Sequence, residues 1–140
     1  MKRISVVAGV IKHQGSVLCV QRPHSKLEYI SRKWEFPGGK VEAGETPESA
    51  LVREIDEELN LCVVVGKLLK IVDHDYPDFF ISMTVYMCTL SQGIEKSDLK
   101  LNEHINYKWM RVINSNFKQL DWAEADVPIV NKILEAEAKR

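Results

Sequence analysis

The sequence has few cysteines, no long hydrophobic run and no excess of either charge. Cys19, Cys62 and Cys88 lie in apolar segments without Cys-x-x-Cys spacing, which disfavours a zinc site and predicts buried, reduced thiols, with one disulfide as the alternative. Lys and Arg total 19 against 20 Asp and Glu, and they form no basic stripe typical of nucleic-acid-binding proteins. The apolar segment from Ile4 to Ile11 is too short to span a membrane. We therefore expect a cytoplasmic protein with neither a membrane nor a nucleic-acid polymer as its partner.

The length and composition bound the architecture. The chain has 140 residues, 45% hydrophobic and 28% charged, which predicts a single globular domain over residues 1–140, as a monomer or homodimer. Segments rich in Val and Ile between turn residues predict strands, and two segments carry helix signals. The expected strands are 4–12, 17–21, 34–36, 62–72, 80–90 and 105–112, and the expected helices are 47–60 and 127–138. Many strands with two helices favour an α+β fold with a mixed sheet.

The first expected helix has clear start and stop signals. Thr46 is suited to cap its N-terminus and Pro47 to occupy its first turn, while Asn60 can end it in a left-handed conformation. Upstream, Pro37-Gly38-Gly39 predicts a turn. Glycine there allows the backbone to approach a ligand closely and leaves the Gly39 carbonyl available to a metal ion.

Three glutamates share one face of this helix. Glu54, Glu57 and Glu58 lie at positions i, i+3 and i+4, so their carboxylates repel one another. The apolar face consists of Leu51, Ile55 and Leu59. A hard cation such as Mg²⁺ or Mn²⁺ would relieve the repulsion, because it prefers several oxygen ligands. The alternative is a solvated acidic face near Arg53 and Lys40.

A charged pair joins the helix to the preceding loop. Glu45 lies just before the helix and Arg53 lies two turns into it. Charge-assisted hydrogen bonds between them would clamp the loop to the helix, so we expect a structural role for both residues.

Together these residues resemble a known motif. Gly39, five residues, Glu45, seven residues and then the run 53–61 (REIDEELNL) are similar to the Nudix box, G-x5-E-x7-R-E-U-x-E-E-x-G-U with U aliphatic. Asn60 replaces the late glycine, which closes the helix and binds nothing. The strand order and the preceding run 34–39 (WEFPGG) resemble the MutT-like branch of the Nudix hydrolases, in particular bacterial CTP pyrophosphohydrolases.

The resemblance implies an α/β/α sandwich with a central mixed β-sheet, and Mg²⁺-dependent hydrolysis of a nucleoside triphosphate to the monophosphate and pyrophosphate. The metal ligands it implies are Gly39, Glu54, Glu57, Glu58 and Glu103. Either Glu54 or Glu103 would act as the general base, with Glu57 also in the catalytic set. Arg22 and Lys40 would bind phosphate, Arg22 through its guanidinium fork. The alternatives are a surface salt bridge for Arg22 and an exposed loop position for Glu103, while His104 is expected to be structural.

The nucleotide base must be read elsewhere. Tyr76 or Phe79 could stack on a base, whereas Trp34 and Phe36 are expected in the core. Asp126 resembles a base-reading position of MutT-like enzymes, but an Asp before Pro128 is also a natural N-cap. The expected substrate is CTP, dCTP or a modified pyrimidine nucleotide. The alternatives are oxidised purine nucleotides such as 8-oxo-dGTP, and a catalytically inactive Nudix domain that binds nucleotide as a regulator.

Overall fold

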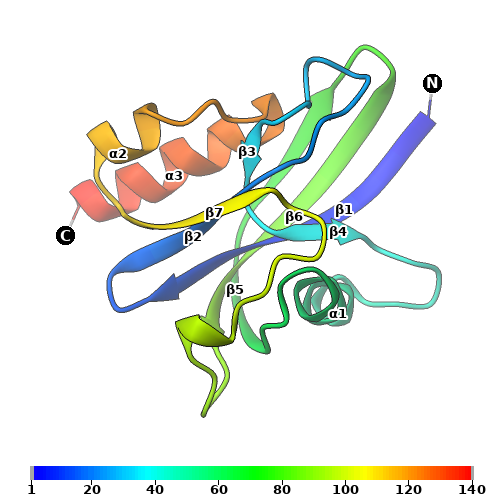
Figure 1. Ribbon diagram of the computed structural model, residues 1–140. Helices are drawn as coiled ribbons and strands as arrows, with labels where there is room; N and C mark the ends of the chain where they lie inside the picture. Colours follow the sequence, from blue (N-terminus) through cyan, green and yellow to red (C-terminus); the bar gives the residue numbers. More distant parts are fainter. Residues whose placement is uncertain (1, 140) are drawn as a thin grey trace.

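A single mixed sheet lies between helices in the computed structural model, which describes residues 2–139 (Figure 1). Seven strands form the sheet, with β3-β2-β1-β6-β5 as its main path, β4 beside β1 and β7 beside β2. The strands are β1 (Lys2–His13), β2 (Ser16–Gln21), β3 (Trp34–Glu35), β4 (Gly38–Lys40), β5 (Val63–Asp75), β6 (Phe79–Leu90) and β7 (Asn106–Arg111). The helices are α1 (Pro47–Leu59), α2 (Asn114–Lys118) and α3 (Val127–Ala138), with short 3₁₀ turns η1 (Lys96–Asp98) and η2 (Glu124–Asp126).

The sheet is mixed and covered on both faces, so the predicted α+β sandwich is confirmed. The β1 and β6 strands run parallel, while the other pairs are antiparallel. One hydrophobic core packs the buried residues of α1 against the sheet, and the second packs α3 and α2 against the other face. In Figure 1, α1 and α3 lie on opposite sides of the strands.

The local signals of α1 are confirmed. Thr46 Oγ1 accepts a hydrogen bond from the Ser49 amide at 3.1 Å, and Pro47 occupies the first turn. Asn60 ends the helix with φ of 56°, the left-handed conformation that Asn tolerates. The buried side chains of the helix are Ala50, Leu51, Ile55 and Leu59.

Other expectations need correction. Pro37-Gly38-Gly39 is not a turn, because Gly38–Lys40 forms β4 against β1, and a Cβ at Gly38 would collide with the Val7 carbonyl. The connection between β5 and β6 is only Tyr76–Asp78, shorter than predicted, and α2 was not predicted.

The thiols are only partly as expected. Cys19, Cys62 and Cys88 are all free, but Cys62 is exposed rather than buried. Within residues 2–139, every helix is too short or too polar to cross a membrane.

Candidate active site

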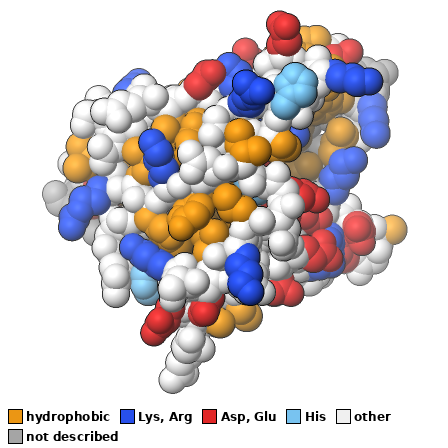
Figure 2. Space-filling view, viewed as in Figure 1, with side chains coloured by type: hydrophobic (Ala, Val, Ile, Leu, Met, Phe, Trp, Pro, Cys, Tyr) orange, Lys and Arg blue, Asp and Glu red, His pale blue; other side chains and the backbone are white. Residues whose placement is uncertain are grey.

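A cavity of about 320 Å³ opens between the sheet, the loop after β2 and η2. The pairing register along β1 places Gly39 beside Val7 and Ile81 beside Ile4. The acidic residues that line the cavity are Glu35, Glu58, Glu103 and Asp126. The apolar lining includes Ile4, Phe36, Phe79, Ile81 and Met83. The cavity thus offers charged groups and an apolar wall to one ligand. In Figure 2, acidic side chains gather over α1.

Glu58 is a partly buried carboxyl group that lies among other carboxyl groups of the cavity. Burial, together with the negative charges of Glu54, Glu103 and Glu35, raises its pKa to about 9. Its Oε2 atom is buried without a hydrogen-bond partner. A buried, unpartnered oxygen among like charges is the environment in which a divalent cation is most favourable, so the donor set fits such a cation.

Asn102 holds the loop that carries Glu103 against the end of α1. Its backbone N–H donates to the Glu58 carbonyl at 3.0 Å, and its side-chain amide donates to the Glu57 carbonyl at 2.6 Å. These carbonyls belong to the last turn of α1, where helix carbonyls lack partners within the helix. Glu103 is exposed, yet it lines the cavity and its charge acts on Glu58. The sequence reasoning missed Asn102.

The other two glutamates of the acidic face are placed differently. Glu54 packs so tightly on β4 that a Cβ at Gly39 would collide with its carboxyl group. Glu57 has a side chain that is 59% exposed, and its Oε2 accepts from Arg53 Nη1 at 3.2 Å. Across residues 2–139, no three His, Cys, Asp or Glu side chains converge closely enough to hold a metal ion in these orientations.

Arg53 and Glu45 form a two-point ion pair. The guanidinium donates to Glu45 Oε2 at 2.7 Å and to Oε1 at 2.8 Å, and it also reaches the Lys40 carbonyl at 3.2 Å. The hydrogen bonds from Arg53, together with one from the Glu42 amide, lower the pKa of Glu45 to about 2. The loop from β4 to α1 is therefore tied to the helix, while the exposed Lys40 lies at the cavity lining.

The carboxylate of Glu35 contacts two other side chains that line the cavity, those of Arg22 and His104. Its Oε1 accepts from Arg22 Nη1 at 3.2 Å, and its Oε2 lies 3.0 Å from His104 Nε2. Arg22 Nε and His104 Nδ1 are buried without partners. The sequence reasoning missed Glu35, because strand alternation places a side chain between the buried aromatics Trp34 and Phe36 on the opposite side of the backbone from them.

Asp126 does not cap α3. It has helical backbone angles, and its side chain makes no capping hydrogen bond, so the N-cap alternative was wrong. Instead its Oδ1 accepts from the Phe36 amide at 3.0 Å. Burial, followed by the nearby Glu35 charge, raises its pKa well above the usual range. The protonated form of this carboxyl group, which lines the cavity, is thereby favoured.

Two aromatic residues line the same cavity near the β5–β6 connection, Tyr76 within it and Phe79 at the start of β6. Phe79 is half-buried, whereas Tyr76 is 4% exposed. The Tyr76 ring packs against three other rings, those of Tyr29, His74 and Phe79. Phe79 is therefore the more accessible stacking surface of the two.

Comparison with known proteins identifies the family. The family described as NUDIX domain matches residues 1–132. The chain is similar to an 8-oxo-dGTP diphosphatase of Proteus vulgaris, with 43% identity over 90 residues that cover 63% of this chain and 78% of the relative. It is also similar to a CTP pyrophosphohydrolase of Escherichia coli (strain K12), with 31% identity over 140 residues that cover 100% and 98%. The solution structure of the E. coli ORF135 protein superposes with a TM-score of 0.79 at 30% identity, covering 100% of this chain and 94% of that one. The chain belongs to the Nudix family and is a hydrolase of nucleotide substrates.

Proposed function

We propose that the protein hydrolyses a nucleoside triphosphate to the monophosphate and pyrophosphate with Mg²⁺ or Mn²⁺ as its cofactor. The observation that carries this proposal is Glu58, whose buried and unpartnered oxygen lies among the charges of Glu54 and Glu103 beside an open cavity. A cation supplies the positive charge that both this carboxyl cluster and a triphosphate require.

The proposed metal ligands are the Gly39 carbonyl and the carboxylates of Glu54, Glu57, Glu58 and Glu103. Glu57 must leave Arg53 to join them, which its exposed side chain permits. When bound, the metal neutralises phosphate oxygens and lowers the pKa of a bound water. Glu54 and Glu103 remain the two candidates for the group that takes the proton from water. The guanidinium group of Arg22 and the ammonium group of Lys40, which both line the cavity, would orient the phosphates.

The proposed base-reading group is the neutral carboxyl of Asp126. A protonated carboxyl offers one O–H donor and one C=O acceptor. Cytosine matches this pair with its N3 acceptor and its N4 amine donor, which supports CTP or dCTP as the substrate. Phe79 is positioned to contact the face of the base.

A second candidate, 8-oxo-dGTP, is favoured by a specific observation. The Proteus vulgaris relative is named for that activity and shares 43% identity over its matched region. Oxidised guanine carries a proton on N7 beside the O6 acceptor, so it also matches Asp126, whereas ordinary guanine has acceptors at both positions. Asp126 alone therefore does not separate the two candidates.

Replacing Glu57 with Gln tests the reaction. We expect pyrophosphate release to fall by about 10²-fold to 10³-fold, the size typical of removing one preorganised electrostatic group. Asp56→Asn is the matched control, because Asp56 is the exposed neighbour of Glu57 on the same helix. EDTA should stop turnover and Mg²⁺ or Mn²⁺ should restore it. Activity of Glu57→Gln equal to that of Asp56→Asn would refute the ligand role.

A pyrophosphate-release screen tests the substrate. It compares kcat/KM for CTP, dCTP, UTP, dGTP and 8-oxo-dGTP in the presence of Mg²⁺. A preference for CTP or dCTP over UTP supports the cytosine proposal, and a preference for 8-oxo-dGTP over dGTP supports the second candidate. Nucleotide binding without release of pyrophosphate from any of them would favour the inactive regulator.

A further inference from the structure

Tyr76 makes a hydrogen bond that no base-stacking role requires. Its hydroxyl oxygen accepts the Ala125 N–H at 3.0 Å, and this bond is buried. Ala125 lies in the middle of η2, which leads directly into α3. The first N–H groups of a helical segment have no partner within that segment. The Tyr76 hydroxyl therefore acts as a capping group for η2, because it accepts one of the free N–H groups of this segment.

The carboxyl group of Asp126 makes no capping hydrogen bond with α3. An Asp at the start of a helix commonly accepts the free N–H groups of its own first turn. Here Asp126 follows Ala125 directly and bonds instead to the Phe36 amide, which turns its carboxyl toward the cavity. A second contact, between His74 Nε2 and Glu124 Oε2 at 3.1 Å, also joins η2 to β5. The segment that carries Asp126 is thus in contact with His74 of β5 and with Tyr76 just after that strand.

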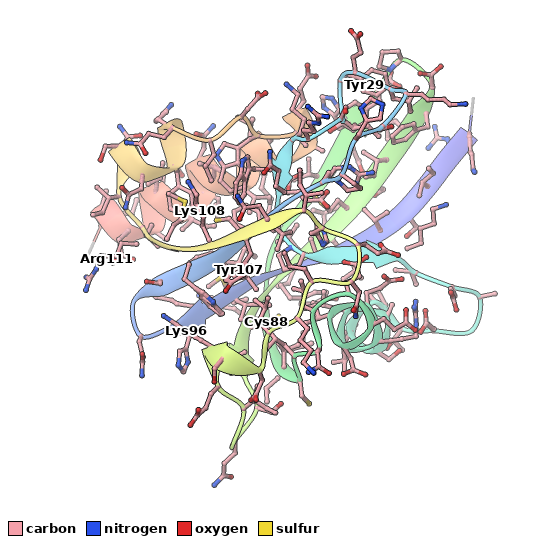
Figure 3. All side chains as sticks on the ribbon, in the orientation of Figure 1. Tyr29, Cys88, Lys96, Tyr107, Lys108 and Arg111 are labelled. Atoms are coloured by element: carbon pink, nitrogen blue, oxygen red, sulfur yellow. The ribbon has the colours of Figure 1, made fainter. Side chains whose placement is uncertain are left out.

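The Tyr29 ring packs against the ring of Tyr76. Tyr29 belongs to the loop between β2 and β3, which Figure 3 shows beside the β5–β6 connection. The two rings stack with centroids 5.4 Å apart and planes 19° apart. The Tyr29 hydroxyl donates to Asp78 Oδ2, so the loop is fastened to the same connection. Tyr29 is not among the described residues that line the cavity.

We propose that Tyr76 is a positioning residue for base recognition: its hydroxyl holds η2 so that the Asp126 carboxyl faces the base, and Tyr29 keeps the Tyr76 ring in place. This inference rests on the proposed function, since it assigns the selectivity of that same cavity. It also replaces base stacking by Tyr76, because other rings already pack around its side chain.

Tyr76→Phe tests the positioning role by removing one oxygen atom. Selectivity is measured as the ratio of kcat/KM for CTP over UTP and for 8-oxo-dGTP over dGTP. We expect the ratio shown by the wild type to fall roughly tenfold, the discrimination typical of one well-placed hydrogen-bonded pair, with the larger part of the change in KM. Tyr86→Phe is the matched control. The Tyr86 hydroxyl lies on β6 and donates to Glu48 of α1 at 3.2 Å, so its removal should not affect η2. An equal loss in the control would overturn the proposal.

According to the proposal, the Tyr76 hydroxyl affects substrate selectivity only by positioning Asp126. In an Asp126→Ala background, Tyr76→Phe should cause no further loss of selectivity, because the group that it positions is gone. Additive losses would instead show that the Tyr76 hydroxyl contacts the base itself, which would overturn the proposal. Tyr29→Ala should lower the ratio in the same direction as Tyr76→Phe, whereas Tyr29→Phe, which keeps the stacked ring, should not. An unchanged ratio in Tyr29→Ala would remove Tyr29 from the proposal.

A measurement without substrate separates this inference from the proposed function. Hydrogen exchange of the Ala125 amide, followed by NMR, should accelerate at least tenfold in Tyr76→Phe and remain unchanged in Tyr86→Phe. Unchanged exchange at Ala125 would overturn the positioning role even if the enzyme hydrolyses triphosphates. If the wild type hydrolyses none of the triphosphates, the proposed function fails, and the exchange result alone decides whether Tyr76 holds η2.

Discussion

At the scale of the residue, the three glutamates of α1 occupy different environments. Glu58 faces the cavity with a buried oxygen, Glu54 packs on β4, and Glu57 extends toward solvent beside Arg53. Their common helix face follows from i, i+3 and i+4 spacing and was predictable. Their separate environments could not be predicted, because they depend on β4 and on the loop that carries Asn102. Asn102 contacts α1 although it lies far from this helix in sequence.

Gly39→Ala should weaken metal binding without unfolding the protein. The new Cβ would meet the Glu54 carboxyl group, a flexible side chain that must turn away. We expect the affinity for Mn²⁺, measured by calorimetry, to fall about 10-fold to 100-fold, as when a metal ligand loses its orientation. Gly38→Ala is the contrasting variant, because its Cβ would meet the backbone of β1 and should lower the melting temperature instead. Unchanged Mn²⁺ affinity in Gly39→Ala would argue against Glu54 as a ligand.

The residues proposed to read the base were harder to predict than those of the helix. Asp126 could be singled out by its resemblance, but two roles fitted it equally well from sequence. Its choice of partner, the Phe36 amide 90 residues earlier, follows only from the packing of η2 against β3. Glu35 gave a weaker signal, since its partners Arg22 and His104 come from separate loops.

At the scale of the element, α1 and β4 show what local signals can and cannot determine. The start and end of α1 were predicted correctly because Thr46, Pro47 and Asn60 act on their own backbone or that of their neighbours. Pro37-Gly38-Gly39 was predicted as a turn, since Pro-Gly-Gly favours turns locally. Gly38–Lys40 instead forms a strand, which the lack of a Cβ at Gly38 permits beside Val7 of β1.

Removing the cap of α1 should cost stability. Thr46→Ala leaves the Ser49 N–H without its acceptor, which lies 3.1 Å away in the wild type. We expect a loss of about 1 kcal/mol in the free energy of unfolding, measured by urea denaturation. Thr46→Ser keeps the hydroxyl and should stay close to the wild type. Equal losses in the two variants would mean that the methyl group, rather than the cap, matters at this position.

At the scale of the whole molecule, a nearly neutral chain carries a local acidic patch. The formal charge is −1, yet acidic side chains gather over α1. Several of them are neighbours on this helix, and the fold brings Glu35 and Glu103 from distant segments to the same cavity as Glu58. The sandwich class was predictable from the pattern of strands and helices. The order β3-β2-β1-β6-β5 was not, because short apolar segments do not specify their neighbours.

This concentration should make the stability of the metal-free protein depend on pH. Glu58 has a pKa of 4.5 as an ordinary glutamate and about 9 in the fold. Between these values the unfolded chain has lost the proton that the folded chain retains, so rising pH favours unfolding. In EDTA, the melting temperature of the wild type should therefore fall relative to that of Glu58→Gln from about pH 4.5 to about pH 9.

Metal ions should reverse this trend, because binding requires the ionised carboxylate and expels its proton. The rise in melting temperature on adding Mg²⁺ should be larger at high pH than at low pH, and smaller in Glu58→Gln. Parallel pH profiles for the wild type and Glu58→Gln, with and without Mg²⁺, would contradict this account.

The parallel pairing of β1 with β6 has a consequence for how the protein is made. Lys2 to Ile11 pair in register with Phe79 to Cys88, so during synthesis β1 emerges well before its parallel partner β6 exists. Contacts between such distant segments slow folding, because a long loop must close before they form. The acidic helix lies between the two strands in sequence and is synthesised before β6 joins the sheet. Assembly of the candidate site therefore awaits the pairing of β6 with β1, and the segments that carry Glu103 and Asp126 are synthesised later still.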